Sequence, residues 1–588
     1  MLVLIIATGI YLTIRTKFFQ VTKVKHINDE TLRAIFCKKS VTKTKEKKAI
    51  SQFQALTTAL AATIGTGNIA GVATAISLGG PGAVFWMWIS AFFGMMTNFS
   101  ENVLGIFYRK KNMHGEWSGG AMYYLSEGLK EKKGIRHIAK PLAVLFCIFC
   151  IFASFGIGNL AQINTISEAM DSTFSIPKIA TGIILAAIAG LVVIGGIKRI
   201  ASVTEKLVPF MAIAYIICTL AVFIMNYDQI PYVFSSIFRS AFNFSAVAGG
   251  AGGYIMKRAV TMGFKRGVFS NEAGLGSSVM VHSASDVKEP VTQGIWGIFE
   301  VFFDTIVVCT LTAFVLLSSS THAVTMEEAL SNVTTEKQVF EIYAGGDYDG
   351  TTLHLIDKNV SRIMEIDQSG TGKEVTVHFD GKDYTTYIDS SIPEAKTSDQ
   401  KSIAEKKYIF TNVMSVRADY VVDQEGNKVL DSNGNETIDV IFEQVNGVSL
   451  VTYAMQQKIG NIAKIITSIA ILLFAFSTSL GWSFYGTKAF EYLFGTKASI
   501  GYKVVFVLFT ILSATMSMQL AWDISDTMNA LMAIPNLIGV LCLSGTVVKI
   551  TNNYLARRFQ GESVRPMLSA YEDIQKLQEE ALRQDEVA

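Results

Sequence analysis

The sequence has little charge and few cysteines. Charged residues make up 17% of its 588 positions, whereas soluble proteins average about 25%. The formal net charge is only +2, which argues against the strongly basic surface that nucleic-acid binding requires. The six cysteines are scattered, mostly within apolar segments, and form neither a metal-binding pattern nor a disulfide framework.

Apolar residues are abundant instead. They make up half of the chain, and they recur in runs of about 20 residues, enough to cross a hydrocarbon core of about 30 Å. We therefore expect an all-α polytopic membrane protein embedded in the lipid bilayer. Residues 1–14 are apolar but short, and we interpret them as the end of a spanning helix that begins before this start. Ten further spans are predicted at residues 52–79, 82–108, 139–168, 177–197, 204–225, 234–256, 291–318, 459–485, 501–520 and 523–546.

Basic residues between the spans predict the orientation. The segment 15–48 is rich in Lys and Arg, and such segments stay on the cytoplasmic side. The same rule places the loop at Arg109 in the cytoplasm, together with a loop that carries Lys257, Arg258, Lys265 and Arg266. The N-terminus is then outside and the C-terminus cytoplasmic.

A long polar insert separates the seventh and eighth spans. Within it, the alternating runs Glu374–Phe379 and Lys382–Ile388 flank Asp380-Gly381, a signal typical of a β-hairpin turn. By the predicted topology this β-rich insert is extracellular. We expect six regions: an N-terminal helix at 1–15, a basic cytoplasmic linker at 16–50, core helices one to seven at 51–318, the insert at 319–458, core helices eight to ten at 459–547, and a cytoplasmic tail at 548–588.

The first of the ten spans is interrupted in its middle. Gly65-Thr66-Gly67-Asn68 breaks an apolar segment, and backbone groups freed at that depth cost several kcal/mol each unless they line a site or a wet cavity. A second small-residue stretch, Ala246–Gly253, lies in the sixth span. Matching breaks in two halves of a transporter point to a binding site between inverted repeats, although small residues also serve close helix packing.

Other polar residues lie deep in the predicted spans. Ser477 and Thr478 offer two hydroxyls, and Gln162 is an amide that is costly there unless it is paired or functional. Trp482 could wall a pocket or mark the membrane interface. Glu101 and Asp304 each need a partner, and for Asp304 we favour a structural anchor over an ion path. His282 is expected at the membrane interface, and with Ser270-Asn271-Glu272 it forms no catalytic set, so an enzyme is not expected.

Four long stretches resemble one transporter family. They are GTGNIAGVATAISLGGPGAVFWMW (65–88), RGVFSNEAGLGSSVMVHSA (266–284), VTQGIWGIFEVFFDTIVVCTLTA (291–313) and FSTSLGWSFYG (476–486). These stretches are similar to the alanine or glycine:cation symporters, also called the sodium/alanine symporter family. The resemblance covers about residues 50–318 and 455–548. The large insert departs from the family, in which the loop before the eighth span is short.

The resemblance implies a LeuT-type fold of two five-helix inverted repeats, with one preceding N-terminal helix. In that fold, freed amides of the first broken helix hold the substrate carboxylate, and carbonyls of the sixth take its ammonium. The implied substrate residues are Thr66, Gly67, Asn68, Gln162, Gly249, Gly250 and Trp482. The implied sodium ligands are the carbonyls of Ala61 and Ile64 with the hydroxyls of Ser477 and Thr478.

The expected function is therefore sodium-coupled uptake of a small neutral amino acid, alanine or glycine, across the plasma membrane by alternating access, with Na⁺ as coupling ion and no cofactor. Many relatives carry an aromatic residue after the Gly-Gly pair, where this chain has Ala251. The pocket could thus admit a larger amino acid such as glutamine, and H⁺ coupling is a further alternative. A channel and a receptor that uses the insert are the other classes considered.

Overall fold

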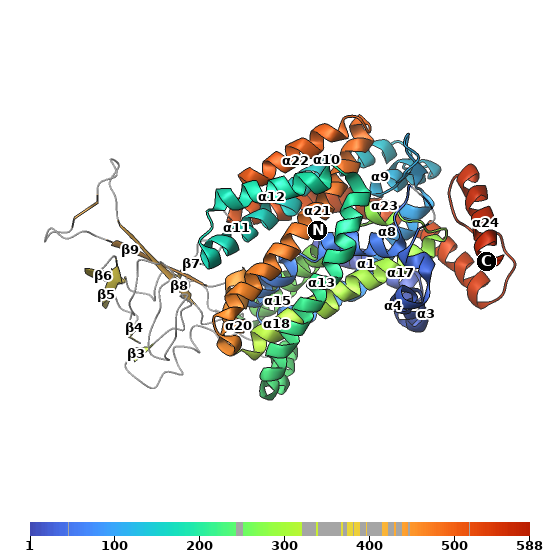
Figure 1. Cartoon of the computed structure of the whole chain (residues 1–588). Coiled ribbons are helices and arrows are strands. Elements are labelled where there is room, and N and C mark those ends of the chain that lie inside the picture. Colours follow the sequence, from blue (N-terminus) through green and yellow to red (C-terminus); the bar gives the residue numbers. More distant parts are fainter. Residues whose placement is uncertain are drawn as a thin grey trace.

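The computed structural model describes residues 1–44, 46, 48–242, 251–319, 447–516 and 518–587, together with residues 428–430 and short strands between 320 and 446. Figure 1 shows a body of long helices, with the labelled strands β3–β9 at one end and helix α24 at the other. The N-terminal part comprises α1 (Leu2–Arg15), α2 (Phe19–Thr22), α3 (Val24–Glu30), α4 (Leu32–Cys37) and α5 (Lys39–Thr42).

The helical body is built from elements that alternate between α-helix and short π-helical turns (η1, η2, η4, η7). Up to residue 318 these are α6 (Gln52–Thr63), η1 (Gly67–Gly71), α7 (Val72–Gly79), α8 (Gly82–Phe107), α9 (Ala121–Tyr123), η2 (Tyr124–Gly128), η3 (Leu129–Glu131), α10 (Ala139–Phe155), η4 (Gly156–Leu160), α11 (Ala161–Phe174), α12 (Lys178–Val193), α13 (Gly196–Met225), η5 (Tyr227–Gln229), α14 (Ile230–Ala241), α15 (Ala251–Asn271), α16 (Val279–His282), α17 (Pro290–Val301), η7 (Phe302–Cys309) and α18 (Thr310–Ser318). After the insert come α20 (Gly447–Ile459), α21 (Ile462–Phe494), α22 (Ser499–Ser513), α23 (Met518–Phe559) and α24 (Glu572–Val587).

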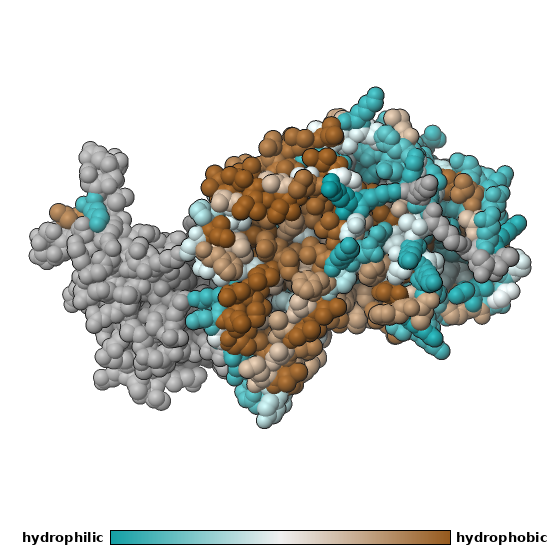
Figure 2. Space-filling model, in the orientation of Figure 1, coloured by the Kyte–Doolittle hydropathy of each residue, from teal (hydrophilic) through white to brown (hydrophobic). Residues whose placement is uncertain are grey.

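An apolar belt crosses the face of the body seen in Figure 2. Figure 2 shows hydrophobic residues across its middle and hydrophilic residues gathered toward its right-hand end. Large apolar side chains on α12, α13 and α22 are exposed there; Leu191 is 67% exposed and Phe210 is 64% exposed. A soluble protein rarely exposes so large an apolar surface, so this belt is the surface that lipid would cover.

Six described helices are long and apolar enough to span a membrane, and α6 with η1–α7 makes a seventh if that pair, bent by 53°, is one span. Three shorter apolar helices are α1, α12 and α22. The span predicted at 234–256 is not among them. The structure has α14 and α15 in this region, and residues 243–250 between them lie outside the described residues.

Helix α15 corrects the predicted placement of four basic residues. Gly263 lies against Ala83 and Gly267 against Ser90, so α15 runs in the same direction as α8. Lys257, Arg258, Lys265 and Arg266 therefore lie toward the end of the body where α8 begins, not near Arg109, and the prediction of one shared cytoplasmic side is wrong. Their charges are tolerated there because partners are at hand: Lys265 is 2.7 Å from Asp526, and the Arg266 guanidinium lies 4.8 Å from the Trp522 ring centre.

The described strands of the insert pair locally. Strand β5 (Lys373–Phe379) is antiparallel to β6 (Lys382–Ile388), with Phe379 opposite Lys382, which is the strand pairing expected around Asp380-Gly381. Likewise β8 (Met414–Tyr420) is antiparallel to β9 (Ile438–Gln444). The short strands are β1 (Lys110–Lys111), β2 (Trp117–Ser118), β3 (Lys337–Gln338), β4 (Ile366–Asp367) and β7 (Ala395–Lys396).

Helix α20 belongs to the helical body although the sequence analysis assigned it to the insert. Its residues Leu450, Ala454 and Met455 are fully buried, and it packs against α18, α21 and η1. The body therefore resumes at Gly447, before the expected boundary at 459.

Candidate functional site

The first break is confirmed at the predicted position. Ser51 and Gln54 form a capping box that starts α6, and α6 ends at Thr63 before two non-helical residues, Ile64 and Gly65. A Cβ at Gly65 would lie 2.4 Å from Thr478 Oγ1. Glycine is therefore the residue that lets α6 approach α21 this closely.

Side-chain oxygens bind the amides freed by this break. The N–H of Gly65 donates to Asn68 Oδ1 at 3.0 Å, and that of Thr66 donates to Gln162 Oε1 at 3.2 Å. Gln162 lies just after the π-helical turn η4, and its own amide donates to the Ile157 carbonyl. The Thr66 hydroxyl is buried and has no partner among the described residues. Gly67, the next residue, begins η1.

The four predicted sodium ligands lie together. The Thr478 hydroxyl is 2.9 Å from the Ala61 carbonyl oxygen and 3.3 Å from that of Ile64. The Ser477 hydroxyl lies 3.4 Å from the Ala61 oxygen and donates at 2.8 Å to Phe474 of its own helix. All four residues are buried. This gives a compact set of neutral oxygens at the end of α6, the type of ligand that a hard cation prefers.

Trp482 lies one turn beyond these hydroxyls and is fully buried, so the interpretation as an interface residue is wrong. Its indole N–H donates to Glu272 Oε1 at 2.7 Å. Its Cβ approaches Gly158 of η4 so closely that a side chain there would have no room. The described contacts thus connect Trp482 with η4 and with the segment after α15.

Most of the second predicted break, Ala246–Gly253, lies outside the described residues, and so do Gly249 and Gly250. Within the described residues a second unwound segment lies at 272–278, where Glu272, Gly274 and Gly276 all have positive φ angles. Asn271 Oδ1 accepts the N–H of Ala273, an Asx turn that helps end α15. This segment combines glycines with polar residues, and the same combination identified the first break. The polar residues are Asn271, Glu272, Ser277 and Ser278.

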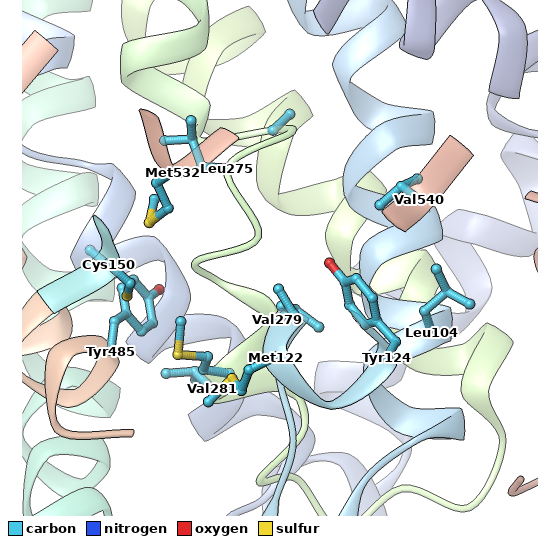
Figure 3. Close-up of a cluster of buried hydrophobic side chains, with 14 of the residues drawn as sticks. Leu104, Met122, Tyr124, Cys150, Leu275, Val279, Val281, Tyr485, Met532 and Val540 are labelled. Carbon is cyan, nitrogen blue, oxygen red and sulfur yellow. The ribbon is translucent and has the colours of Figure 1, made fainter. Parts of the chain in front are cut away.

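This segment is packed inside the body. Residues 271–285 are all buried, and only α16 is helical within 272–285. Figure 3 shows Leu275, Val279 and Val281 of this segment among Leu104 of α8, Cys150 of α10 and Tyr485 of α21. His282 is fully buried as well, so the prediction that it lies at the membrane interface is wrong.

Asp304 joins the two unwound segments. The Asn68 amide donates to Asp304 Oδ1 at 2.7 Å and to Ser270 Oγ at 3.1 Å. The Ser270 hydroxyl in turn donates to Asp304 Oδ2 at 2.6 Å, as does that of Thr305 at 2.8 Å. Asp304 is fully buried within η7. The sequence analysis named Asp304 as an anchor but missed Ser270 as its partner; an acid inside a span was the available signal.

Comparisons with known proteins point in one direction. The model of the sodium:alanine symporter family matches residues 1–350 and 431–567. The chain is 38% identical over 554 residues to the sodium/alanine symporter AgcS of Methanococcus maripaludis, covering 94% of each chain. It is 40% identical over 323 residues to a protein of Bacillus subtilis described as a probable sodium/glutamine symporter, GlnT, covering 55% of this chain and 63% of that one.

Among solved structures, a manganese transporter of Eremococcus coleocola aligns with 90% of this chain and 83% of its own, at 11% identity and a TM-score of 0.41. A similarity this low does not define the fold.

Proposed function

Because this chain belongs to the sodium:alanine symporter family, we propose that it carries a small neutral amino acid, alanine or glycine, into the cell together with Na⁺. The family is one of sodium-coupled amino-acid symporters, so the chain is a multi-pass membrane protein and not an enzyme. The observation that carries the proposal is the approach of the Thr478 hydroxyl to the Ala61 and Ile64 carbonyl oxygens.

Sodium would bind among the oxygens of Ala61, Ile64, Ser477 and Thr478. The two carbonyls are available because α6 stops at Thr63. The N–H of Gly65 donates to Asn68 Oδ1 rather than to Ala61, and the N–H of Asn68 donates to the Gly65 carbonyl rather than to Ile64. The site takes one ligand set from α6 and the other from α21. Because the cation would bind to ligands of both helices at once, its binding would hold α21 against the broken helix.

The amino-acid carboxylate would bind next to this cation, at Thr66, Gly67 and Asn68. Support comes from the amides of Gly65 and Thr66, which donate to side-chain oxygens of Asn68 and Gln162 that a carboxylate could replace, and from the unpartnered Thr66 hydroxyl. Trp482 would close the site on the side of η4. The ammonium group would meet backbone carbonyls at Gly249 and Gly250.

The architecture we propose is the LeuT type, with two inverted five-helix repeats and the β-rich insert outside the cell. The two unwound segments, at 64–65 and 272–278, are connected through Asn68 and Ser270, which lie next to them in the sequence, and through Asp304. Such paired breaks are typical of inverted-repeat transporters. The N-terminus would be outside and the C-terminus cytoplasmic. One Na⁺ moving down 100 mV provides ~2.3 kcal/mol. Na⁺ and amino acid would strengthen each other's binding by the same factor, since both stabilise one shape of the broken helix.

A larger substrate is the second candidate. The similarity to the protein described as a sodium/glutamine symporter and the small side chain at Ala251 favour it. Coupling to H⁺ in place of Na⁺ is a further alternative. It is tested by measuring uptake under an imposed pH gradient in the absence of Na⁺.

Uptake into proteoliposomes tests the proposal. We expect radiolabelled alanine to accumulate under an inward Na⁺ gradient, with glycine competing strongly and glutamine weakly. Strong competition by glutamine would instead favour the larger substrate. Thr478→Ala should abolish the sodium dependence. Ser483→Ala is the matched control, because among the described residues that hydroxyl bonds only to Leu480 of its own helix; it should transport normally.

A further inference from the structure

A fully buried histidine–carboxylate pair lies on the second unwound segment. His282 of α16 and Glu300 of α17 are both 0% exposed, and His282 Nε2 is 2.9 Å from Glu300 Oε2. Neither residue belongs to the proposed sodium or amino-acid site. The pair lies toward the end of the body at which α8 ends, because the carbonyls of Ser283 and Ser285, just after His282, accept hydrogen bonds from Arg109, which follows α8. The proposed topology places this end in the cytoplasm.

The hydrogen bonds around the pair leave room for one further proton. Gln293 Nε2 lies 2.6 Å from His282 Nδ1, so Nδ1 accepts a hydrogen bond from the amide and Nε2–H donates to Glu300 Oε2. With the imidazole neutral in this arrangement, an ionised Glu300 would carry the charge of the pair. Its second oxygen, Oε1, is buried and has no partner among the described residues, and Asn98 approaches Oε2 only at 3.4 Å. An ionised carboxylate without a cation is costly in such surroundings.

The groups that face the pair make this charge less favourable still. Glu300 interacts with three other buried acids, Glu101 of α8, Glu272 of the unwound segment and Asp304 of η7, and with Tyr485 of α21. Glu101, Glu272 and Asp304 hydrogen-bond to neutral groups. The Arg109 guanidinium, on the adjoining segment, bonds to carbonyls and lies 4.1 Å from the Trp117 ring centre. On α21, Lys488 is paired with Glu491.

We propose that His282 and Glu300 together bind one proton from the cytoplasm, and that its loss accompanies opening of the segment 272–285 toward that side. This inference rests on the proposed function, since it assigns a regulatory proton to the same transport cycle. The proton binds to the free oxygen of Glu300, or to His282 Nδ1 once the Gln293 amide has turned its oxygen toward the ring. The only bond that breaks is the O–H bond of the water or hydronium ion that donates this proton.

The sign of the effect follows from charge. With the proton bound, the pair is neutral overall and the segment stays packed against α8 and α17. When the proton leaves, Glu300 adds a negative charge beside Glu101, Glu272 and Asp304, which favours an open segment that admits water. Raising the cytoplasmic pH therefore favours opening and release of Na⁺ and amino acid inward. One linked proton changes the opening equilibrium by at most about tenfold per pH unit.

Sodium-driven alanine uptake tests this with the internal pH of the proteoliposomes varied from about 6 to about 8, the range in which histidine titrates, and the external pH held constant. Wild-type uptake should slow several-fold toward low internal pH. Glu300→Gln, which keeps the shape but cannot ionise, should flatten this dependence, and His282→Gln should do the same. Glu127→Gln, on a partly exposed acid paired with Lys110 and Lys130, should keep the wild-type profile.

The outcomes separate the two proposals. Sodium-driven uptake that is insensitive to internal pH in the wild type, or unchanged pH dependence in Glu300→Gln, overturns the proton site and leaves the symport intact. Absence of sodium-driven uptake at every pH overturns both. If neither variant folds, proton binding is measured on the wild-type protein with a pH-sensitive dye in weak buffer. Adding Na⁺ and alanine should change the number of bound protons. No change in that number overturns the proton site.

Discussion

Gly65 is the residue at which the proposed sodium ligands approach the first break most closely. A Cβ at this position would lie 2.4 Å from Thr478 Oγ1, 3.0 Å from Gln162 Oε1 and 3.2 Å from Thr478 Cβ. The short, branched side chain of Thr478 cannot turn away without moving its hydroxyl from the Ala61 carbonyl. The role of Gly65 is thus steric.

We expect Gly65→Ala to abolish sodium-dependent uptake while the protein still reaches the membrane. Gly71→Ala is the matched control on the same broken helix, since a Cβ there would meet only Arg266 Cδ at 3.8 Å, an ordinary contact; it should retain most of the uptake. The measurement is initial alanine uptake per molecule of inserted transporter. Full activity of Gly65→Ala would contradict the close approach of α6 and α21.

Single residues also show how far sequence reasoning reaches. The gathering of Ala61, Ile64, Ser477 and Thr478 could be expected from family resemblance, because the motifs on α6 and α21 are continuous in sequence. The pairing of His282 with Glu300 could not. This pairing depends on how a non-helical segment folds back against α17. The periodicity of apolar residues in the sequence does not predict the path of such a segment.

At the scale of elements, Asp304 of η7 binds both unwound segments. Its two oxygens accept from Asn68, just after the first segment, and from Ser270, just before the second. A shift of either segment would remove one of the three side-chain donors of a buried carboxylate, the third being Thr305, and a lost hydrogen bond to a buried group costs about 1–3 kcal/mol. The two segments are therefore expected to move together.

A charge exchange tests this coupling. Asn68→Asp places a carboxylate 2.7 Å from Asp304 Oδ1 and should abolish uptake and lower the melting temperature. Adding Asp304→Asn restores one donor and one acceptor, and should recover stability and part of the uptake, because contacting residues couple by about 0.5–3 kcal/mol. Asp304→Asn alone is the reference. A double variant no better than Asn68→Asp would contradict the link.

The second unwound segment illustrates why elements were only partly predictable. The first break was found because it interrupts an apolar run. The second follows α15, whose Lys257, Arg258, Lys265 and Arg266 were assigned to a cytoplasmic loop. Lys265 and Arg266 instead pair with Asp526 of α23, and the positive-inside rule, which counts loop charges, does not see partners on a distant helix.

At the scale of the whole molecule, the insert is separable from the helical body. Helix α18 ends at Ser318 and α20 begins at Gly447, and these two helices pack against each other. A short connection can therefore join them. The apolar belt in Figure 2 lies on the helical body, so membrane insertion does not depend on the strands.

Deleting residues 322–444 and joining the ends with a short Gly/Ser linker should leave alanine uptake within about twofold of the wild type. Helices α18 and α20 already pack against each other, and a shorter loop lowers the entropic cost of closure, by about 0.6 kcal/mol per halving of its length. Uptake and surface expression are measured together. Loss of uptake in a properly inserted deletion variant would assign the insert a role in transport or sensing.

The most direct test of the account measures sodium and amino acid in the same vesicles. Proteoliposomes receive radioactive Na⁺ and labelled alanine, and both influxes are followed at constant membrane potential. The account predicts that alanine accelerates sodium influx in the wild type in a fixed ratio to its own uptake, and that Thr478→Ala loses this coupled sodium influx while Ser483→Ala keeps it. Alanine uptake without accompanying sodium influx would contradict sodium coupling at this site.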